Sequence, residues 1–480
     1  MSWRGLPTAI IWISRRECAG GVRKIHTSNR KTAATASIGT LPGVVAKPKS
    51  YSSNSSITPL SILPTPNVLR TYLIASVTAS PLLLRGCFAV LNRLLESKST
   101  IIDVDRNPIL RQIFKQTLYA QFCAGETKEE VRRTTSAMKS VGFDGIILEY
   151  ALELLLDEKA TNAVDPEVTK SEIATWKQGM TDSVDMTDSG EFVGLKWSGL
   201  GTEALRLLRG GQLPSPAMEQ AIHEICDHAA AKNVKLLPSA EEESTNIGID
   251  RWTQALQKKY NRDRSKGAIL YNTYQAYLTS CPGKLARGLA EAEQEGYTLG
   301  VKLVRGAYMS SEPRSNIWSS KEETDKAYDE LTESLIRRKY LGRLQPHDGS
   351  EGHAFPNVSI MLATHNQTSV RKAQEIRNEL ATKGEQLGEL AYAQLYGMAD
   401  EIGCQLVQNS KAAKRERETI GVQLDMPRTF KLVAWGTTKQ CLHFLYRRAR
   451  ENQDAIARTK ETKQAMWEEL VRRMKALVVK

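Results

Sequence analysis

The sequence lacks two patterns that would indicate a protein class directly. Its seven cysteines are scattered and include no C-x-x-C pair, which excludes a dense disulfide framework and a recognisable zinc knuckle. No apolar run reaches the roughly 18 residues that a membrane-spanning helix needs. The best candidate, residues 72–84, lies between Arg70 and Arg85. For this stretch, a helix packed on the body and a helix lying on a membrane surface both remain open.

Acidic residues are scarce at the N-terminus. Residues 1–60 hold nine of the 66 lysines and arginines but only one of the 54 acids, Glu17, so most of the net charge of +12 belongs to this segment. An Arg-rich, Ser/Thr/Ala-rich opening with a short apolar patch is typical of a mitochondrial transit peptide. We therefore predict a transit peptide and leader over residues 1–50, with a disordered basic tail as the alternative. A nucleic-acid-binding function is rejected, because the rest of the chain is nearly balanced in charge.

From residue 145 onward, short aliphatic runs alternate with amphipathic stretches. Eight strands, each followed by a helix, predict a parallel α/β architecture, and eight is the number that closes a TIM-type (β/α)8 barrel. An open, doubly wound sheet is the alternative. The predicted strands cover 145–149, 192–196, 234–238, 268–272, 300–305, 358–363, 390–395 and 430–435.

The flanks of this region predict the remaining organisation. We assign residues 51–135 to an N-terminal helical region, 136–460 to the barrel and 461–480 to a C-terminal amphipathic helix. The polar connection 157–191 is predicted to be a surface excursion. Active sites of barrels lie at the C-terminal ends of the strands, and polar or cationic groups recur at the predicted ends, at Lys196, Ser239, Gln275, Arg305, Tyr308, His365 and Asn366.

Residues 301–308 (VKLVRGAY) form an aliphatic run that carries two cations, Lys302 and Arg305. A strand inside a parallel sheet is buried on both faces, and a buried cation is costly unless an anion or hydrogen bonds compensate it. Something negative or strongly polar should therefore meet this strand. A bound group and a structural ion pair would both satisfy that need.

Two further segments carry candidate site residues. ATHN (363–366) ends the sixth predicted strand with a hydroxyl, an imidazole and an amide, which suit a polar cofactor; a loop that caps the next helix through Asn366 would look the same. In FLYRRAREN (444–452), Arg447 and Arg448 lie about 100° apart on a helix and form a fork for a carboxylate, with Glu451 one turn away to hold them. A solvated, salt-bridged helix face is the alternative.

Together, VKLVRGAY, ATHN, AQLYGMAD (393–400) and FLYRRAREN, in this order, resemble proline dehydrogenase, the FAD-dependent mitochondrial proline oxidase, and its fungal members in particular. The resemblance covers about residues 65–460 and implies a distorted (β/α)8 barrel with FAD at the strand ends. It matches Lys196, Tyr308, Leu395, Arg447 and Arg448 to the substrate pocket, and Glu451 to the acid that orients the arginines. The flavin-contacting positions it implies are Gln275, Lys302, Arg305, Gly306, Ala307, Thr364, His365 and Asn366.

The activity implied by the resemblance is hydride transfer from L-proline to FAD, which yields Δ1-pyrroline-5-carboxylate, with electrons passed to membrane quinone. It also implies peripheral contact with the mitochondrial inner membrane, from residues 72–84 or the C-terminal helix. Three positions depart from the family pattern: Ser239 replaces an acid, and Leu432 and Phe444 replace tyrosines. They leave open a paralogue that acts on hydroxyproline or another cyclic amino acid, or a catalytically weakened flavin-binding protein.

Overall fold

The computed structural model describes residues 58–478, apart from residues 98, 100, 153–164, 310, 350–353 and 452–455. The predicted transit peptide therefore lies outside the described residues, and so does the side chain of Glu451. The described residues all fall within one compact unit, which spans Ser55–Lys480.

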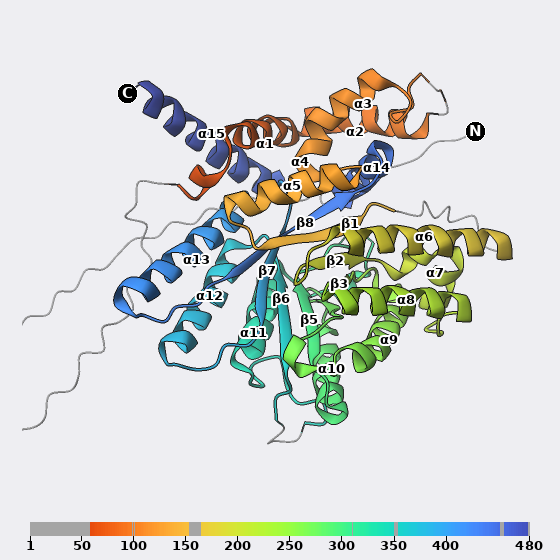
Figure 1. Cartoon of the computed structure of the whole chain (residues 1–480), viewed down its shortest axis with the longest axis vertical. Coiled ribbons are helices and arrows are strands. Elements are labelled where there is room, and N and C mark those ends of the chain that lie inside the picture. Colours follow the sequence, from red (N-terminus) through yellow and green to blue (C-terminus); the bar gives the residue numbers. More distant parts are fainter. Residues whose placement is uncertain are drawn as a thin grey trace, which may run out of the picture. The chain divides into compact units, whose positions relative to one another are not determined.

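Eight parallel strands form the centre of this unit (Figure 1), in the order β3-β2-β1-β8-β7-β6-β5-β4. A parallel bridge between Leu236 and Leu270 brings the two ends together, with Leu236 N donating to Ile269 O at 2.7 Å. The sheet is thus a nearly closed barrel, and the predicted fold class is confirmed. The strands are β1 (Gly145–Tyr150), β2 (Phe192–Leu195), β3 (Lys235–Pro238), β4 (Asn272–Gln275), β5 (Leu299–Val304), β6 (Val358–Ala363), β7 (Leu390–Leu395) and β8 (Arg428–Trp435).

Helices follow the strands and cover the outside of the barrel (Figure 1). Many start at residues that the local sequence favours, such as the Ser320 cap of α11 and the Asn366 cap of α12. The helices of this layer are α5 (Lys128–Val141), α6 (Pro166–Met186), α7 (Thr202–Arg209), α8 (Pro216–Lys232), α9 (Glu243–Tyr260), α10 (Cys281–Glu295), α11 (Lys321–Arg337), α12 (Gln367–Thr382) and α13 (Asp400–Ile420). Helix α14 (Thr438–Glu451) instead packs at the C-terminal ends of β1 and β2.

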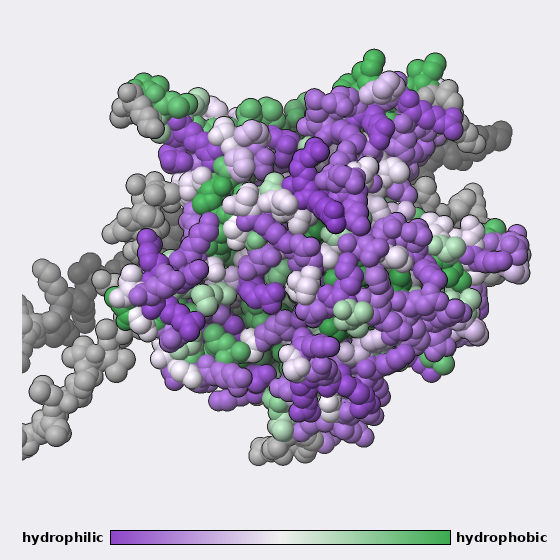
Figure 2. All heavy atoms as spheres, in the orientation of Figure 1, coloured by the Kyte–Doolittle hydropathy of each residue, from purple (hydrophilic) through white to green (hydrophobic). Residues whose placement is uncertain are grey.

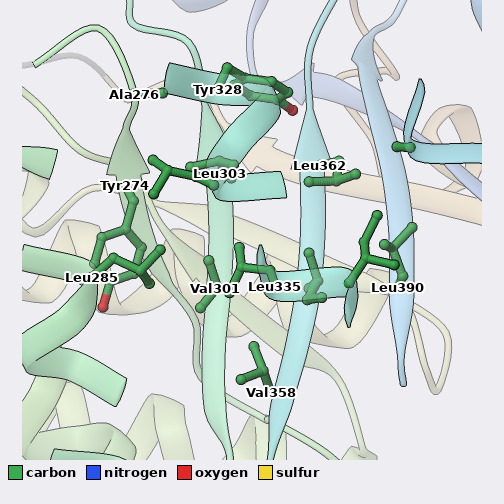
Figure 3. Packing of buried hydrophobic residues seen from close by; sticks show 14 of the residues in the cluster. Tyr274, Ala276, Leu285, Val301, Leu303, Tyr328, Leu335, Val358, Leu362 and Leu390 are labelled. Atoms are coloured by element: carbon green, nitrogen blue, oxygen red, sulfur yellow. The ribbon is translucent and has the colours of Figure 1, made fainter. Parts of the chain in front are cut away.

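The largest core lies between the strands and these helices. Alternate residues of β5 and β6, such as Val301, Leu303 and Leu362, point outward and pack against Leu285 of α10 and Leu335 of α11 (Figure 3). Because side chains alternate along a strand, the residues between them face the barrel interior. Lys302 is one of those residues.

A second group of helices lies on one side of the barrel (Figure 1): α1 (Thr65–Thr78), α2 (Pro81–Glu96), α3 (Pro108–Phe114), α4 (Ala120–Phe122) and α15 (Ile456–Val478). Tyr72 of α1 packs against Trp467 of α15, with ring centroids 5.4 Å apart. None of the described helices is long and apolar enough to cross a membrane by itself; α1 and α2 meet that test only as a pair bent by 97°.

Glu469 ties α15 to the segment before α1. Its carboxylate accepts hydrogen bonds from Arg472, Arg473 and Thr58, and Arg473 also donates to Leu63 O at 2.8 Å. Burial raises the pKa of the Glu469 carboxyl, but the bonds from Arg472, Thr58 and Arg473 outweigh burial and lower the pKa to about 2.

Two local predictions were wrong. The connection 157–191 is not a surface excursion over its second half, because α6 buries Trp176, Met180 and Val184 against the barrel. The fourth strand was predicted over 268–272, whereas the hydrogen-bonded strand is Asn272–Gln275.

Candidate active site

The lower part of the barrel interior is apolar. Nearly every strand contributes to one cluster of buried side chains there, and Phe192 meets Phe430 edge to face, with centroids 4.9 Å apart. Such a filled interior is a packed core and offers no space for a ligand. The cluster includes Ile147, Phe192, Leu237, Tyr271, Met361, Ala391, Ala393 and Phe430.

Charged residues enter the interior above this cluster. Lys302 lies opposite Met361 in the β5–β6 register, and Glu149 lies two residues beyond Ile147 on β1, so both face inward. Burial lowers the pKa of the Lys302 ammonium, the charge of Glu149 opposes that change and the charge of Lys196 adds to it. These three residues therefore share one electrostatic environment near the C-terminal mouth.

Lys302 differs from the other lysines that are buried in the described part of the chain. Lys235 lies 2.7 Å from Glu389, and Lys431 lies 2.9 Å from Asp400. Lys302 is only 6% exposed, yet no hydrogen bond or ion pair joins it to any residue within the described ranges. Its positive charge is thus available to a group that enters the barrel mouth.

Arg305 has a structural partner instead. Its guanidinium pairs with Asp325 of α11, donates to Ser369 Oγ at 3.2 Å and lies over the ring of Tyr328. Of the two cations that the sequence places on this strand, Arg305 thus has the structural ion pair.

The turn after β5 is shaped by a close approach of backbone to an aromatic ring. Gly306 has φ +149°, and a Cβ built there would lie 2.2 Å from Tyr277 Cδ1. Only glycine therefore fits at this position. Ala307 and the buried Tyr308 follow it toward the mouth.

The residues after β6 are held by hydrogen bonds within the protein. Asn366 N donates to Thr364 Oγ1 at 3.1 Å, and Asn366 Oδ1 caps α12 by accepting from Ser369 N at 3.0 Å. His365 Nε2 accepts from Leu395 N at 3.0 Å, so in this geometry that nitrogen carries no proton. The Asn366 cap is present, and the imidazole fixes the end of β7.

A hollow opens beside Lys196, between the ends of β1 and β2 and helix α14. It encloses about 310 Å³ of space not filled by atoms, part of which is open to solvent, and its walls include Glu149, Lys196, Trp176 and Phe444. Lys196 follows β2 directly. The hollow therefore joins the mouth of the barrel to α14.

Helix α14 presents the arginine pair one turn after Phe444. Arg448 is half-buried, with its guanidinium 5.8 Å from the centre of the Phe444 ring, whereas Arg447 is exposed. The structure thus brings Lys196, Lys302 and Arg448 to the same end of the barrel. Gln275 is buried at the end of β4, where its amide donates to Glu241 O at 2.9 Å.

The three departures occupy different surroundings. Leu432 packs on the apolar interior cluster, and Phe444 is buried in the wall of the hollow. Ser239 is half-buried, and its N–H donates to Leu195 O at 2.8 Å. Sequence reasoning did not select Glu149, although the same signal was present: a charged residue inside an aliphatic strand. Among the described residues, no group of three or more His, Cys, Asp or Glu side chains is arranged to hold a metal ion.

Comparison with known proteins gives a consistent result. A family model described as proline dehydrogenase matches residues 131–461. A mitochondrial protein of Schizosaccharomyces pombe named probable proline dehydrogenase is 27% identical over 420 residues, which cover 76% of this chain and 80% of the relative. Proline dehydrogenase 1 of Arabidopsis thaliana, a mitochondrial protein, is 26% identical, and the match covers 86% of this chain and 85% of the relative. Hydroxyproline dehydrogenase of Bos taurus is 26% identical, and the match covers 75% of this chain and 82% of the relative.

The fold also matches a solved structure. Proline utilization A from Bdellovibrio bacteriovorus superposes with a TM-score of 0.55 at 14% sequence identity and covers 78% of this chain. The matched part is 38% of that longer protein, so this chain corresponds to one portion of it.

Proposed function

Since this chain belongs to the proline dehydrogenase family, we propose that it oxidises L-proline to Δ1-pyrroline-5-carboxylate, with FAD as hydride acceptor and membrane quinone as the final electron acceptor. The observation that carries the proposal is Lys302. A buried ammonium without a direct ion pair among the described residues needs a negative or electron-rich group beside it. A flavin that gains electrons in the barrel mouth is such a group.

The residues at the strand ends fit a flavin. Lys302 supplies positive charge that favours the reduced form, and the close packing of Gly306 on Tyr277 requires a residue without a side chain at this one position of the turn after β5. Hydrogen bonds hold Thr364, His365 and Asn366 in place before any ligand arrives. When bound, FAD supplies the site that accepts the hydride. The other residues proposed to hold it are Gln275, Arg305 and Ala307.

In the proposed substrate pocket, the protein binds and orients the amino acid. Arg447 and Arg448 are assigned to the substrate carboxylate, because adjacent guanidinium groups can bind it through several charge-assisted hydrogen bonds. Lys196 adds positive charge, and Glu451 is assigned to the arginines. Tyr308 and Leu395 form walls that exclude water. The amine must be neutral when the hydride leaves, since its lone pair forms the new C=N bond.

Hydroxyproline is the second candidate substrate, because a relative named hydroxyproline dehydrogenase also covers most of this chain. The pocket favours proline. Leu432 lies on an apolar cluster and Phe444 has no hydroxyl, so a ring hydroxyl group would lose hydrogen-bond partners there. We therefore place proline first.

We also propose a mitochondrial location, at the matrix face of the inner membrane. The basic leader and the relatives whose names include "mitochondrial" support it. Helices α1, α2, α3 and α15 expose large hydrophobic residues along one edge (Figure 2), which supports peripheral membrane contact. These residues are Leu69, Leu73, Leu82, Leu83, Val90, Ile109, Ile113, Trp467, Met474, Leu477 and Val478.

Anaerobic absorbance spectroscopy of the purified full-length protein tests the function. We expect an oxidised-flavin band that L-proline bleaches, and slower bleaching by hydroxyproline. A flavin reduced only by hydroxyproline would reverse the substrate assignment. If no cyclic amino acid reduces the flavin, the protein would be assigned as a flavin-binding protein and not as an enzyme.

A further inference from the structure

Glu149 is a buried carboxylate that the proposed mechanism does not use. It is 7% exposed and lies in the wall of the hollow that also contains Lys196 and Phe444. No hydrogen bond or ion pair reaches it from the residues that the structure describes. A buried carboxylate in this condition is costly unless a cation joins it.

The neighbouring strand leaves room for this side chain. Gly194 of β2 lies opposite Glu149 in the register, and a Cβ built at Gly194 would lie 3.3 Å from Glu149 Cβ and 3.4 Å from Glu149 Oε2. A larger side chain at this position would push the carboxylate away. The absence of a side chain at Gly194 therefore leaves space for Glu149 to extend along the wall of the hollow.

The two ends of a cyclic amino acid carry or develop opposite charges during the oxidation and need opposite partners. The arginine pair of α14 supplies positive charge for the substrate carboxylate. The nitrogen is neutral when the hydride leaves but gains positive charge as the C=N bond forms, and Ser239, which stands where the family has an acid, supplies no carboxylate for that charge. Glu149 lines the same hollow as Lys196 and carries the required charge.

We propose that the Glu149 carboxylate faces the amino group of the substrate and stabilises positive charge on its nitrogen. This inference rests on the proposed oxidation of proline. In that reaction, the C–H bond of the ring carbon beside nitrogen breaks, and the hydride takes both electrons of that bond to the flavin. The nitrogen lone pair forms the C=N bond, so positive charge develops on nitrogen. The negative charge of Glu149 beside it would stabilise the transition state.

A merely structural role is the competing explanation, because the charge of Glu149 also acts on Lys302. The two roles differ in their ligand dependence. A substrate contact matters for proline but not for tetrahydrofuran-2-carboxylate, which has an ether oxygen in place of the amine. A charge-balancing role affects both ligands through the flavin and the lysines.

The test uses the full-length flavin-loaded protein and its Glu149→Gln variant. Proline kcat/KM is measured anaerobically, and the dissociation constant of tetrahydrofuran-2-carboxylate is measured from the perturbation of flavin absorbance. We expect kcat/KM for proline to fall about 10- to 100-fold, with flavin content retained and the affinity for the ether analogue unchanged or higher. Equal losses for both ligands, or no loss for proline, would overturn the inference.

Glu191→Gln is the matched control. Glu191 is also buried and also packs against a glycine of the neighbouring strand, Gly145, but its partner is Lys139, at 2.6 Å. Gly145 lies about 13 Å along β1 from Glu149. This variant should lower stability without changing the ratio between the two ligands.

Glu149→Asp separates the two explanations even if the Gln variant loses flavin. It keeps the negative charge in the barrel mouth, where a longer-range effect on Lys302 changes little, but it shortens the reach of the carboxylate by one methylene group, which a direct substrate contact would not tolerate. Loss of proline turnover with normal binding of the ether analogue would support the substrate contact. Wild-type values of kcat/KM for proline and of the dissociation constant of the ether analogue would show that Glu149 balances the charge of the lysines and does not contact the substrate. If proline fails to reduce the flavin of the wild-type protein, the proposed function itself fails, which is a separate result.

Discussion

The turn after β5 offers a sharp test of how the barrel mouth is built. In Gly306→Ala, the new residue would have φ +149°, a conformation that costs a residue other than glycine about 1–3 kcal/mol. Its Cβ would also lie 2.2 Å from Tyr277 Cδ1, far inside the contact distance of about 3.5–4.0 Å. Such overpacking costs about 1–3 kcal/mol, so we expect the free energy of unfolding to fall by about 2–6 kcal/mol.

Urea unfolding followed by far-ultraviolet circular dichroism measures this loss, and flavin content measured in parallel reports on the site. Gly190→Ala is the control, because Gly190 has φ +81° but no described heavy atom within 4 Å of a Cβ built there. In this variant the free energy of unfolding should fall by only about 1–2 kcal/mol, the cost of a positive φ at a residue other than glycine. Flavin content should fall in Gly306→Ala and remain normal in Gly190→Ala.

A double-mutant cycle isolates the clash from the backbone strain. In a Tyr277→Ala background, Gly306→Ala should cost about 1–3 kcal/mol less than in the wild type, because the ring that it would strike is absent. The same cost in both backgrounds would refute the packing argument. A cost for Gly306→Ala no greater than that of Gly190→Ala would refute it as well.

Three other predictions concern the substrate pocket and the helix that closes the fold. Arg447→Ala should raise the KM for proline at least tenfold with flavin retained; an unchanged KM in steady-state assays would contradict the carboxylate assignment. Ser239→Asp combined with Leu432→Tyr should lower the ratio of kcat/KM for proline over hydroxyproline, because both substitutions give a ring hydroxyl group hydrogen-bond partners, and an unchanged ratio would show that these departures do not set specificity. Glu469→Gln should lower the free energy of unfolding by about 2 kcal/mol in neutral urea titrations. Because the folded pKa of Glu469 is depressed to about 2 from 4.5, this contribution is complete above pH 4.5 and is lost as the pH falls toward 2, so the difference between wild type and variant should shrink over that range.

The sequence predicts the elements of the barrel well where the local pattern and the fold agree. The bounds of β6 and β7 match the predicted ranges, because continuous aliphatic runs end at turn residues. Helix α6 was missed, although Trp176, Met180 and Val184 recur every four residues. Polar residues between these positions make the segment look solvent-exposed in the sequence, and its apolar face is buried only by packing against the barrel.

The candidate site shows a different limit. The cations of β5 signalled a need for partners, but the partner of Arg305 is Asp325 on the next helix, and no local pattern specifies that pairing. The position of Glu149 relative to Lys302 depends on closure of the whole sheet. Side chains that meet across a barrel come from distant strands, so only the tertiary structure relates them.

The three buried lysines of the described chain suggest why this arrangement persists. Lys235 and Lys431 each have a carboxylate at ion-pair distance, which compensates part of the cost of their burial. Lys302 and Glu149 act on each other only through longer-range charge interaction. An apolar pair at these two positions would be expected to leave the barrel as stable or more stable, since replacing buried charges with packed apolar side chains is often neutral or stabilising. The chain instead keeps one positive and one negative group at the mouth, where a flavin that gains electrons and the positive charge that develops on the substrate nitrogen would each supply the missing charge.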